Sequence, residues 1–405
     1  MKRLAVFLDG TWNGPAEETN VSRLYDLVAR QDAAGTDQFC HYDPGVGTEP
    51  FPRLLAGALG EGLSRTVRDA YRFLVHNYED RDEVYLFGFS RGAYTARSLG
   101  GLVTFCGLLQ KHSRLTIEEV YDRYQKRQGS TVPIAKLEFL RRSGARLGGD
   151  DARLLEGSRR IPIRMIGVWD TVGTLGIPWT VPLIGRKAFH FHNPNLSTIY
   201  EHAFQALAID ENRAAYHPTL WTLFAPEVSG TSSPLPPAPE SMRRIEQRWF
   251  IGAHANVGGS LKGDPLPFIP LAWMQGKAER LGLKFKKTVT VPPGAWMAPP
   301  ADSYARFLGG SYRALTFGRP CWRPIGWERR KVPGGWSYPV NEVIDETVFE
   351  RAQATDYRPK NLLDWAERTD SDLMKASGDQ VALWPPTGVP PVGSVRRRGV
   401  ATSLI

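Results

Sequence analysis

The sequence lacks the features that would assign it to a membrane-spanning, exported or metal-binding class of protein. None of its apolar runs approaches the roughly 20 residues needed to cross a bilayer, and the run LAVFL near the start is too short for the core of a signal peptide. Cys40, Cys106 and Cys321 are odd in number and form no metal-binding spacing such as CxxC. We therefore expect free thiols, a cytoplasmic location, and neither a metal nor another cofactor.

The charge of the chain is positive but spread out. The net charge is +9 over 405 residues, and short basic clusters are scattered along the sequence rather than gathered in one stripe. The simplest interpretation is a solvated basic surface; the alternative is attraction to an anionic partner such as a phospholipid membrane. No helix-turn-helix, zinc-finger or RNA-binding signature is present, so nucleic acid is not an expected partner.

Apolar runs alternate with helical patterns, which predicts an α/β protein with a mostly parallel central sheet flanked by helices. Four segments are predicted as helices: 20–32, 60–78, 92–109 and 270–283. Asn20 or Ser22 is the expected N-cap of the first of these helices. The segment 199–213 also has a helical pattern. Other parts are predicted as strands: 3–10, 37–47, 82–90, 161–173 and 245–259.

The expected organisation is one catalytic domain followed by a tail. Residues 1–375 form the predicted α/β-hydrolase-like domain, and residues 376–405 have the composition of a poorly ordered, Pro/Arg-rich tail. Within the domain, residues 291–340 are rich in proline, glycine and tryptophan. This segment is expected to be irregular, either as an aromatic cap or lid over an apolar site or as a surface loop wrapped on the core.

The most informative short motif is Gly88-Phe89-Ser90-Arg91-Gly92, which fits G-x-S-x-G. In a nucleophile elbow, the serine occupies a strained turn between a strand and a helix, so the positions two residues away must lack bulk. Here the motif follows a buried strand and precedes a helix of small residues, as the elbow requires. Ser90 is therefore the candidate nucleophile.

A serine nucleophile needs a base and an orienting carboxylate, which in this architecture follow in the order Ser, Asp or Glu, His. Asp170 ends the predicted strand MIGVW and is the candidate acid, although an Asx-turn or helix cap would look the same. His254 follows another predicted strand and precedes a glycine-rich turn, so it is the candidate base. His202, on the helical pattern 199–213, is held in reserve.

The oxyanion of such a site would be bound by backbone N–H groups. The residue after the nucleophile, Arg91, is one expected donor, and Gly10 or Thr11, in the turn after the first strand, is the other. Asp9 precedes this turn, where it either caps the turn, binds a cation or holds the loop; its charge should point away from the oxyanion. The cluster Asp210, Glu211 and Arg213 is interpreted as a structural ion-pair network, with support of the site's residues as the alternative.

Seven stretches in order make the sequence resemble a known family: FLDGTWN, NVSRLY, YDPGVGT, GFSRGAYTARSLGGLV, VWDTVG, HAFQALAIDENR and WFIGAHANVGGS. The set resembles the α/β-hydrolase family called domain of unknown function 2235, which includes type VI secretion phospholipase effectors. The resemblance implies a Ser-Asp-His hydrolase of ester bonds, with phospholipids as the lipid substrate of the toxic members. It also implies signal-independent export and a secretion-machine or immunity partner.

The expected function is a serine esterase of the lipase or phospholipase type that works through an acyl-enzyme. Compared with the large effectors, the chain is expected to be little more than the catalytic domain, without their membrane-docking module. Two alternatives stay open at this point. One is a hydrolase of soluble esters or thioesters, and the other is a binding or regulatory module of the same fold with a silent triad.

Overall fold

The computed structural model describes residues 1–10, 18–45, 57–127, 129, 131–172, 199–226, 244–326, 330–332 and 335–381. Thr11 and residues 382–405 of the predicted tail lie outside this described part. No helix within it is both long and apolar enough to cross a membrane.

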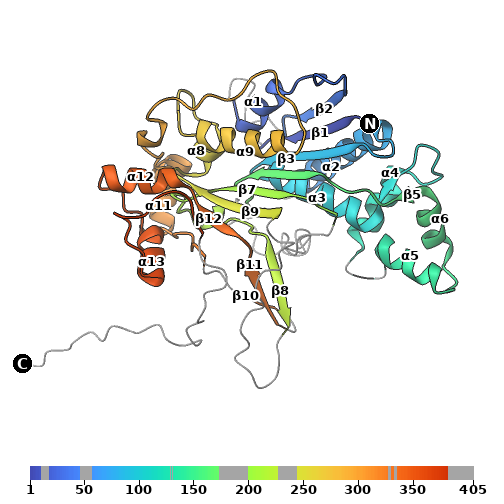
Figure 1. Cartoon of the computed structure of the whole chain (residues 1–405). Helices are drawn as coiled ribbons and strands as arrows, with labels where there is room; N and C mark the ends of the chain where they lie inside the picture. The colour runs from blue at the N-terminus through green and yellow to red at the C-terminus, as the bar shows by residue number, and fades with distance from the viewer. Residues whose placement is uncertain are drawn as a thin grey trace, which may run out of the picture.

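In the described part of the chain, eight strands form one central sheet (Figure 1). All neighbours pair in parallel except β13, which runs antiparallel to β12 at one edge. In spatial order the strands are β13 (Gln380–Val381), β12 (Glu342–Ile344), β9 (Ile245–Phe250), β7 (Ala203–Ala208), β6 (Met165–Trp169), β3 (Glu83–Phe89), β1 (Arg3–Leu8) and β2 (Gln38–Asp43). The predicted α/β-hydrolase-like class is confirmed.

Helices cover both faces of the sheet because its central strands are apolar on both sides. Along β3, Val84 and Leu86 belong to one apolar cluster, and Tyr85 and Phe87 belong to the other. The first cluster is covered by α2 (Gly57–Asn77) and α3 (Arg91–Cys106). The second is covered by α1 (Asn20–Leu27), α8 (His254–Gly258) and α9 (Phe268–Arg280).

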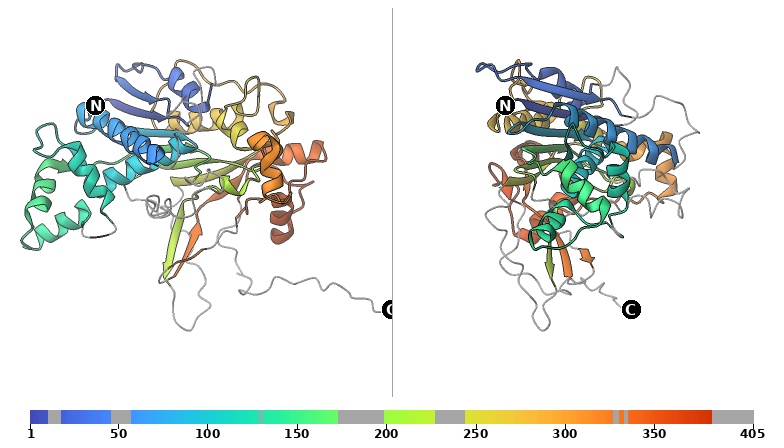
Figure 2. Two further views of the ribbon diagram at one scale, coloured as in Figure 1. Left: turned by 180° about the vertical axis from the view of Figure 1, so that it is seen from behind. Right: turned by 90° about the vertical axis from the view of Figure 1, so that its right-hand side faces the viewer.

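Smaller elements surround this three-layer core. At the side that Figure 1 shows on the right lie β4 (Leu108–Leu109), α4 (Ile117–Gln125), α5 (Ile134–Arg142), α6 (Gly149–Gly157) and β5 (Ser158–Arg159). At the opposite side lie α12 (Glu346–Ala354) and α13 (Lys360–Thr369), as Figure 1 and the left view of Figure 2 show. A separate antiparallel sheet consists of β10 (Arg330–Val332), β11 (Gly335–Pro339) and β8 (Thr222–Pro226).

The segment 291–340 combines short regular elements with irregular chain. Besides β10 and β11 it contains η3 (Ala295–Met297), α10 (Ser303–Arg306), η4 (Phe307–Gly310) and α11 (Ser311–Leu315). The chain then returns to the central sheet as β12. Since β12 pairs with β9, the residues beyond 291 are built onto the same sheet as the N-terminal half.

The helix predicted over 199–213 is wrong, because residues 203–208 form the central strand β7. The sequence AFQALA favours a helix by intrinsic propensity. All six of its side chains are buried, however, so the strand shows no alternation that would reveal it. Its one polar side chain, Gln205, accepts a hydrogen bond from Thr171 Oγ1 at 2.6 Å. Tertiary burial therefore overrides the local preference.

Two further expectations change at the ends of elements. The N-cap of α1 is Thr19, whose Oγ1 accepts the N–H of Ser22, rather than Asn20 or Ser22. Asn20 is instead buried, and its side chain donates to the carbonyls of Val257 and Pro267. The start of the predicted tail is also structured, since Gln380–Val381 pairs with β12.

Candidate active site

Ser90 lies at the sharp turn between β3 and α3. Its φ is 57°, a left-handed conformation that a non-glycine residue adopts only when its surroundings hold it there. A Cβ added to Gly92 would lie 2.0 Å from the carbonyl oxygen of Leu8, and one added to Gly88 would lie 2.5 Å from that of Gly92. The two flanking glycines are therefore required by direct backbone contact, as the motif predicts.

Asp170 and His254 come from the carboxyl ends of β6 and β9 and meet Ser90 at one edge of the sheet. His254 Nε2 is 2.8 Å from Ser90 Oγ, and His254 Nδ1 is 2.5 Å from Asp170 Oδ2. Because an ionised carboxylate can only accept, Nδ1 carries the proton donated to Asp170, and Nε2 is left to accept from the serine hydroxyl. This tautomer is the one that can take a proton from Ser90.

His202, the reserve candidate, is not near this constellation. It precedes β7, and its carbonyl oxygen accepts the N–H of Ile166 near the amino end of β6. It therefore lies at the opposite edge of the sheet from Ser90. Its ring stacks on Phe204, with centroids 6.2 Å apart. Burial, followed by the charge of Arg164, lowers the pKa of His202.

Arg323 is a member of the site that the sequence analysis missed. Its Nη1 donates to Asp170 Oδ1 at 2.6 Å and its Nη2 donates to Asp170 Oδ2 at 2.9 Å. Asp170 is fully buried, which by itself would raise the pKa of its carboxyl, but Arg323 and then His254 bring that pKa below its usual range. The surrounding sequence CWRPIG has no periodicity or motif that would have singled out this arginine.

A second buried ion pair supports His254 from its backbone side. Glu211 accepts the N–H of His254 at 3.2 Å and two hydrogen bonds from the guanidinium of Arg213, at 2.8 and 2.7 Å. Burial would raise the pKa of Glu211, but Arg213 lowers it below its ordinary value. Glu211 and Arg213 therefore form an ion pair, and this pair also contacts the backbone of the candidate base, His254. Asp210 is separate, because it accepts from Gly252 N–H and Tyr357 OH.

The turn after β1 is held by Asp9. Asp9 Oδ1 accepts the N–H of Gly10 at 2.7 Å, and Oδ2 accepts from Thr19 Oγ1 at 2.5 Å and Tyr42 OH at 3.0 Å. In this conformation the N–H of Gly10 is thus directed at Asp9, which removes it as an oxyanion donor. Asp9 has the loop-holding role that was one of its three expected roles. Arg91 contributes the first N–H of α3, directly after Ser90.

Aromatic rings line the candidate base. The His254 ring lies 4.7 Å from the centroid of Phe89 and 5.0 Å from that of Tyr216. Tyr216 in turn meets Phe307 at 5.6 Å, edge to face. Tyr216 belongs to η1 (Ala214–Tyr216) and Phe307 to the segment 291–340, so that segment reaches the neighbourhood of the site. His254 is therefore flanked by two aromatic rings as well as by the carboxylates of Asp170 and Glu211.

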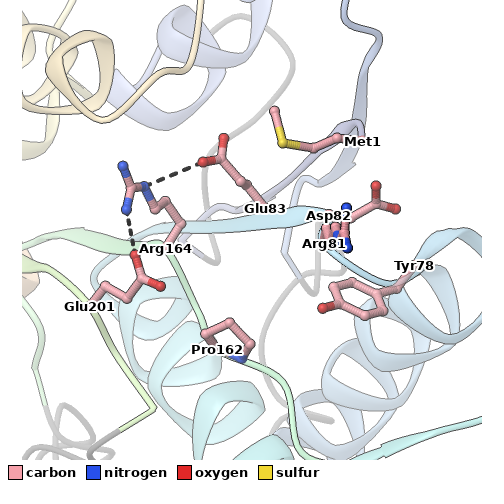
Figure 3. A pocket seen from close by; sticks show the side chains of 8 residues that line it. All are labelled: Met1, Tyr78, Arg81, Asp82, Glu83, Pro162, Arg164 and Glu201. Carbon is pink, nitrogen blue, oxygen red and sulfur yellow. Dashed lines mark hydrogen bonds and ion pairs between the residues drawn. The ribbon is translucent and has the colours of Figure 1, made fainter.

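A hollow of about 280 Å³ lies at the other, amino edge of the sheet (Figure 3). Its lining is mostly charged or polar and includes Arg81, Asp82 and Glu83, while Arg164 extends between Glu83 and Glu201. It contains no nucleophile–base pair and belongs to the edge opposite Ser90. Among the described residues, no group of three His, Cys, Asp or Glu side chains is arranged to hold a metal ion.

A family model described as the catalytic domain of Tle1-like phospholipase effectors of the type VI secretion system (T6SS) matches residues 2–277. The chain belongs to this family. The match confirms the resemblance carried by the seven sequence motifs, and it contains Ser90, Asp170 and His254. Arg323, in contrast, lies beyond the matched residues.

The individual relatives are distant from this chain in sequence, and each is longer than it. An uncharacterized protein of Saccharomyces cerevisiae, YEL023C, is 27% identical over 298 residues, which are 66% of this chain and 42% of that protein. An uncharacterized protein from Pseudomonas aeruginosa has a TM-score of 0.39 at 16% identity and is matched over 78% of this chain and 50% of its own. The Tle1 effector bound to the VgrG spike of the type 6 secretion system has a TM-score of 0.36 at 16% identity, over 66% and 52%. This chain thus spans about half the length of these proteins.

Proposed function

We propose that this chain is a serine hydrolase that cleaves carboxylic esters, with phospholipid acyl esters as its substrates. The observation that carries the proposal is the line of contacts from Ser90 Oγ through His254 to Asp170, 2.8 and 2.5 Å long, at a serine held with a positive φ. Family membership favours an ester substrate with a lipid chain. Residues 1–375 would act as one catalytic domain, since β12 belongs to the same sheet as the strands that hold the triad.

The proposed reaction has two halves. Ser90 Oγ attacks the acyl carbonyl while His254 Nε2 takes the hydroxyl proton, and the carbonyl oxygen becomes an oxyanion that the N–H of Arg91 stabilises. The tetrahedral intermediate collapses as the bond to the leaving alcohol breaks, and His254 returns the proton to that alcohol. Water, deprotonated by the same histidine, then hydrolyses the acyl-enzyme and restores Ser90.

The aromatic surroundings of the base suit an acyl chain. Phe89, Tyr216 and Phe307 form an aromatic wall, in which Phe89 and Tyr216 lie against His254 and Phe307 packs on Tyr216. The Arg213 guanidinium lies over Tyr216 and Phe307, and the remaining ring surface is of the kind that a fatty acyl chain buries. This wall favours the lipase or phospholipase type over an esterase for small polar esters. The segment 291–340, which supplies Phe307, would then act as the cap of the site.

An exposed phenylalanine within this cap is the proposed point of contact with a membrane. Phe317 is 88% exposed and has a φ of 52°, and its turn is fixed by the hydrogen bond from Gly318 N–H to Arg313 O at 2.8 Å. Arg313 and Arg319 are also exposed. A projecting aromatic ring between two cations fits an anionic lipid surface.

Substitution of Phe317 by serine tests this contact. We expect about tenfold weaker binding to anionic phospholipid vesicles, since burying a Phe side chain is worth roughly 1.5–3 kcal/mol, with unchanged hydrolysis of a soluble ester. Phe39 on β2 is also exposed, at 42%, and has no Lys or Arg within four positions of the chain; Phe39→Ser is therefore the control, which should bind vesicles normally. Equal binding by both variants and the wild type would remove Phe317 from the membrane contact.

The proposed setting is export by a type VI secretion system, with a secretion-machine partner and a cognate immunity partner. This part rests on the family and on the name of one solved relative, a Tle1 effector bound to a VgrG spike. The protein would be made in the cytoplasm and act on the phospholipids of another cell.

The deciding experiment compares the wild type with Ser90→Ala on a short-chain nitrophenyl ester and on mixed phospholipid vesicles. We expect the wild type to cleave both and the variant to lose about 10⁴- to 10⁶-fold in kcat. Cleavage of the soluble ester alone would keep the triad and reject the lipid substrate. No cleavage of either, or equal activity of the variant, would favour a binding or regulatory module with a silent triad.

A further inference from the structure

Arg323 has no place in the reaction steps above, yet it touches the catalytic acid directly. Its side chain is 2% exposed and meets the Asp170 carboxylate through two parallel N–H···O contacts. Two-bonded arginine–carboxylate pairs are strong and fix the plane of the carboxylate. Because Arg323 lies beyond residue 277, it is supplied by a part of the chain outside the family match.

Backbone carbonyls hold the Arg323 guanidinium, and the chain on both sides of Arg323 is anchored as well. Beyond Asp170, Nη1 donates to Ala208 O at 3.0 Å and Nη2 donates to Tyr216 O at 2.5 Å. On one side of Arg323, Cys321 N–H donates to Asn212 O at 2.8 Å. On the other, Ile325 is 1% exposed within the apolar cluster that includes Trp249 and Phe349. Arg323 therefore cannot leave Asp170 unless its whole segment shifts.

Each oxygen of the Asp170 carboxylate accepts two hydrogen bonds. Oδ1 accepts from Arg323 Nη1 and from Ala208 N–H, whereas Oδ2 accepts from Arg323 Nη2 and His254 Nδ1. An unpaired carboxyl in such a buried place would favour its neutral form. A neutral carboxyl would hold the Nδ1–H tautomer of His254 poorly, because that tautomer depends on a strong acceptor.

We propose that Arg323 is a positioning residue that keeps Asp170 ionised and aims its Oδ2 at His254 Nδ1. The C-terminal segment beyond the family match thereby completes the catalytic centre. The inference rests on the proposed function, since it takes Ser90, His254 and Asp170 as a working triad. The competing explanation is an ion pair that stabilises the fold and does nothing for catalysis.

The test compares three substitutions at two arginines. Arg323→Met removes the charge and both hydrogen bonds, and Arg323→Lys keeps the charge but loses the paired contact. Arg248→Met is the matched control, because Arg248 is also largely buried and paired with acidic residues, here Glu246, Asp345 and Asp379, but does not touch the triad. Each variant is checked for folding by thermal melting and circular dichroism, and then assayed on a soluble nitrophenyl ester.

We expect Arg323→Met to lower kcat by about 10- to 100-fold with KM nearly unchanged. The kcat of Arg323→Lys should lie between those of Arg323→Met and the wild type, and Arg248→Met should keep the wild-type kcat. In an Asp170→Asn background, Arg323→Met should cause almost no further loss of kcat, since both changes act through one carboxylate.

The pH dependence gives a second readout. The charged or titratable groups around Asp170 are Arg323 and His254, with Glu211 and Arg213 behind them. Without Arg323, the Asp170 carboxyl would take up its proton at a higher pH. The acid limb of the pH–rate profile should therefore move to higher pH.

A spectroscopic readout separates this inference from the proposed function. The far-downfield proton resonance of His254 Nδ1–H should be present in the wild type, shifted in Arg323→Met and unchanged in Arg248→Met. If the wild type hydrolyses no ester but this pattern holds, the proposed function fails and the positioning by Arg323 stands.

Three results would overturn the inference: a folded Arg323→Met protein with wild-type kcat, losses that add fully to those of Asp170→Asn, or an unmoved resonance. Should Arg323→Met not fold, Arg323→Lys decides. A wild-type kcat and pH profile in Arg323→Lys would reject the positioning role, whereas reduced kcat that does not add to Asp170→Asn would support it.

Discussion

Each edge of the central sheet holds an arginine that is paired with acidic side chains at the amino edge and with a single carboxylate at the carboxyl edge, and the two arginines differ in exposure. At the amino edge Arg164 spans Glu83 and Glu201 beside the hollow of Figure 3, with its side chain 34% exposed. At the carboxyl edge Arg323 is 2% exposed and shares Asp170 with His254. Water screens the first pair, whereas the second has only protein groups to balance its charge.

Backbone strain does not separate the two edges. Ser90 and Asp170, at the carboxyl edge, have φ values of 57° and 42°, but Arg81, beside the hollow at the amino edge, has a φ of 76°. Strained residues persist wherever surrounding contacts hold them. Burial and shared hydrogen bonds, rather than strain, charged residues or a hollow, therefore distinguish the edge that holds the proposed triad.

The largest effect is expected from a change that fills the space beside the elbow. In Gly92→Ala, the new Cβ would lie 2.0 Å from Leu8 O and 2.5 Å from Asp9 O, so β1 and α3 must move apart. We expect a loss of about 3 kcal/mol or more in unfolding free energy, measured by urea denaturation. Gly276→Ala, also in a helix and with no heavy atom within 4 Å of its Cβ, is the control. It should be neutral or slightly stabilising.

The next effect compares two aspartates at opposite edges with pKa shifts of opposite sign. At the carboxyl edge, burial raises the pKa of Asp210 to about 6 against the hydrogen bonds from Gly252 and Tyr357. The folded protein then holds a proton between pH 4 and 6 that the unfolded chain releases, so its stability falls as the pH rises through that window. The span is at most about 3 kcal/mol, and Asp210→Asn should flatten this slope.

At the amino edge, the hydrogen bond from Arg3 lowers the pKa of Asp32 to about 2. The stability that Asp32 contributes is present above about pH 4 and is lost as the pH falls toward 2. Asp32→Asn should thus lower stability at neutral pH and remove part of the acid sensitivity, the reverse of Asp210→Asn. Thermal melts of both variants from pH 2 to 7 give the slopes. Identical slopes would show that the two edges do not differ in this respect.

Much of the site follows from the sequence because parallel strands bring their carboxyl ends to one edge. Ser90, Asp170 and His254 each follow an apolar run, and their order along the chain fits a known arrangement, so their meeting could be predicted. The requirement for Gly88 and Gly92 could be predicted for the same reason. The sequence leaves His202 as an alternative because it begins one of the family-like stretches, HAFQALAIDENR, just as His254 lies in another.

The remaining parts depend on contacts that no local pattern reports. β7 has helix-favouring residues and becomes a strand because its neighbours β6 and β9 bury all of it. Arg323 meets Asp170 across 153 positions of sequence, from a stretch without periodicity. The direction of the Gly10 N–H depends on Asp9, whose carboxylate has to turn back to accept it. These are tertiary outcomes rather than failures of motif recognition.

The smallest effect is expected at the amino edge itself, where Arg164→Met removes the arginine that bridges Glu83 and Glu201. Both the arginine and Glu201 are partly exposed, at 34% and 40% of their side chains, so solvent already screens the pair. We expect a change below about 1 kcal/mol in unfolding free energy and no change in ester hydrolysis. Denaturation and the nitrophenyl ester assay, run beside Arg323→Met, measure both. A loss of activity as large as that of Arg323→Met would mean that the amino edge also serves the reaction, and the contrast between the two edges would have to be abandoned.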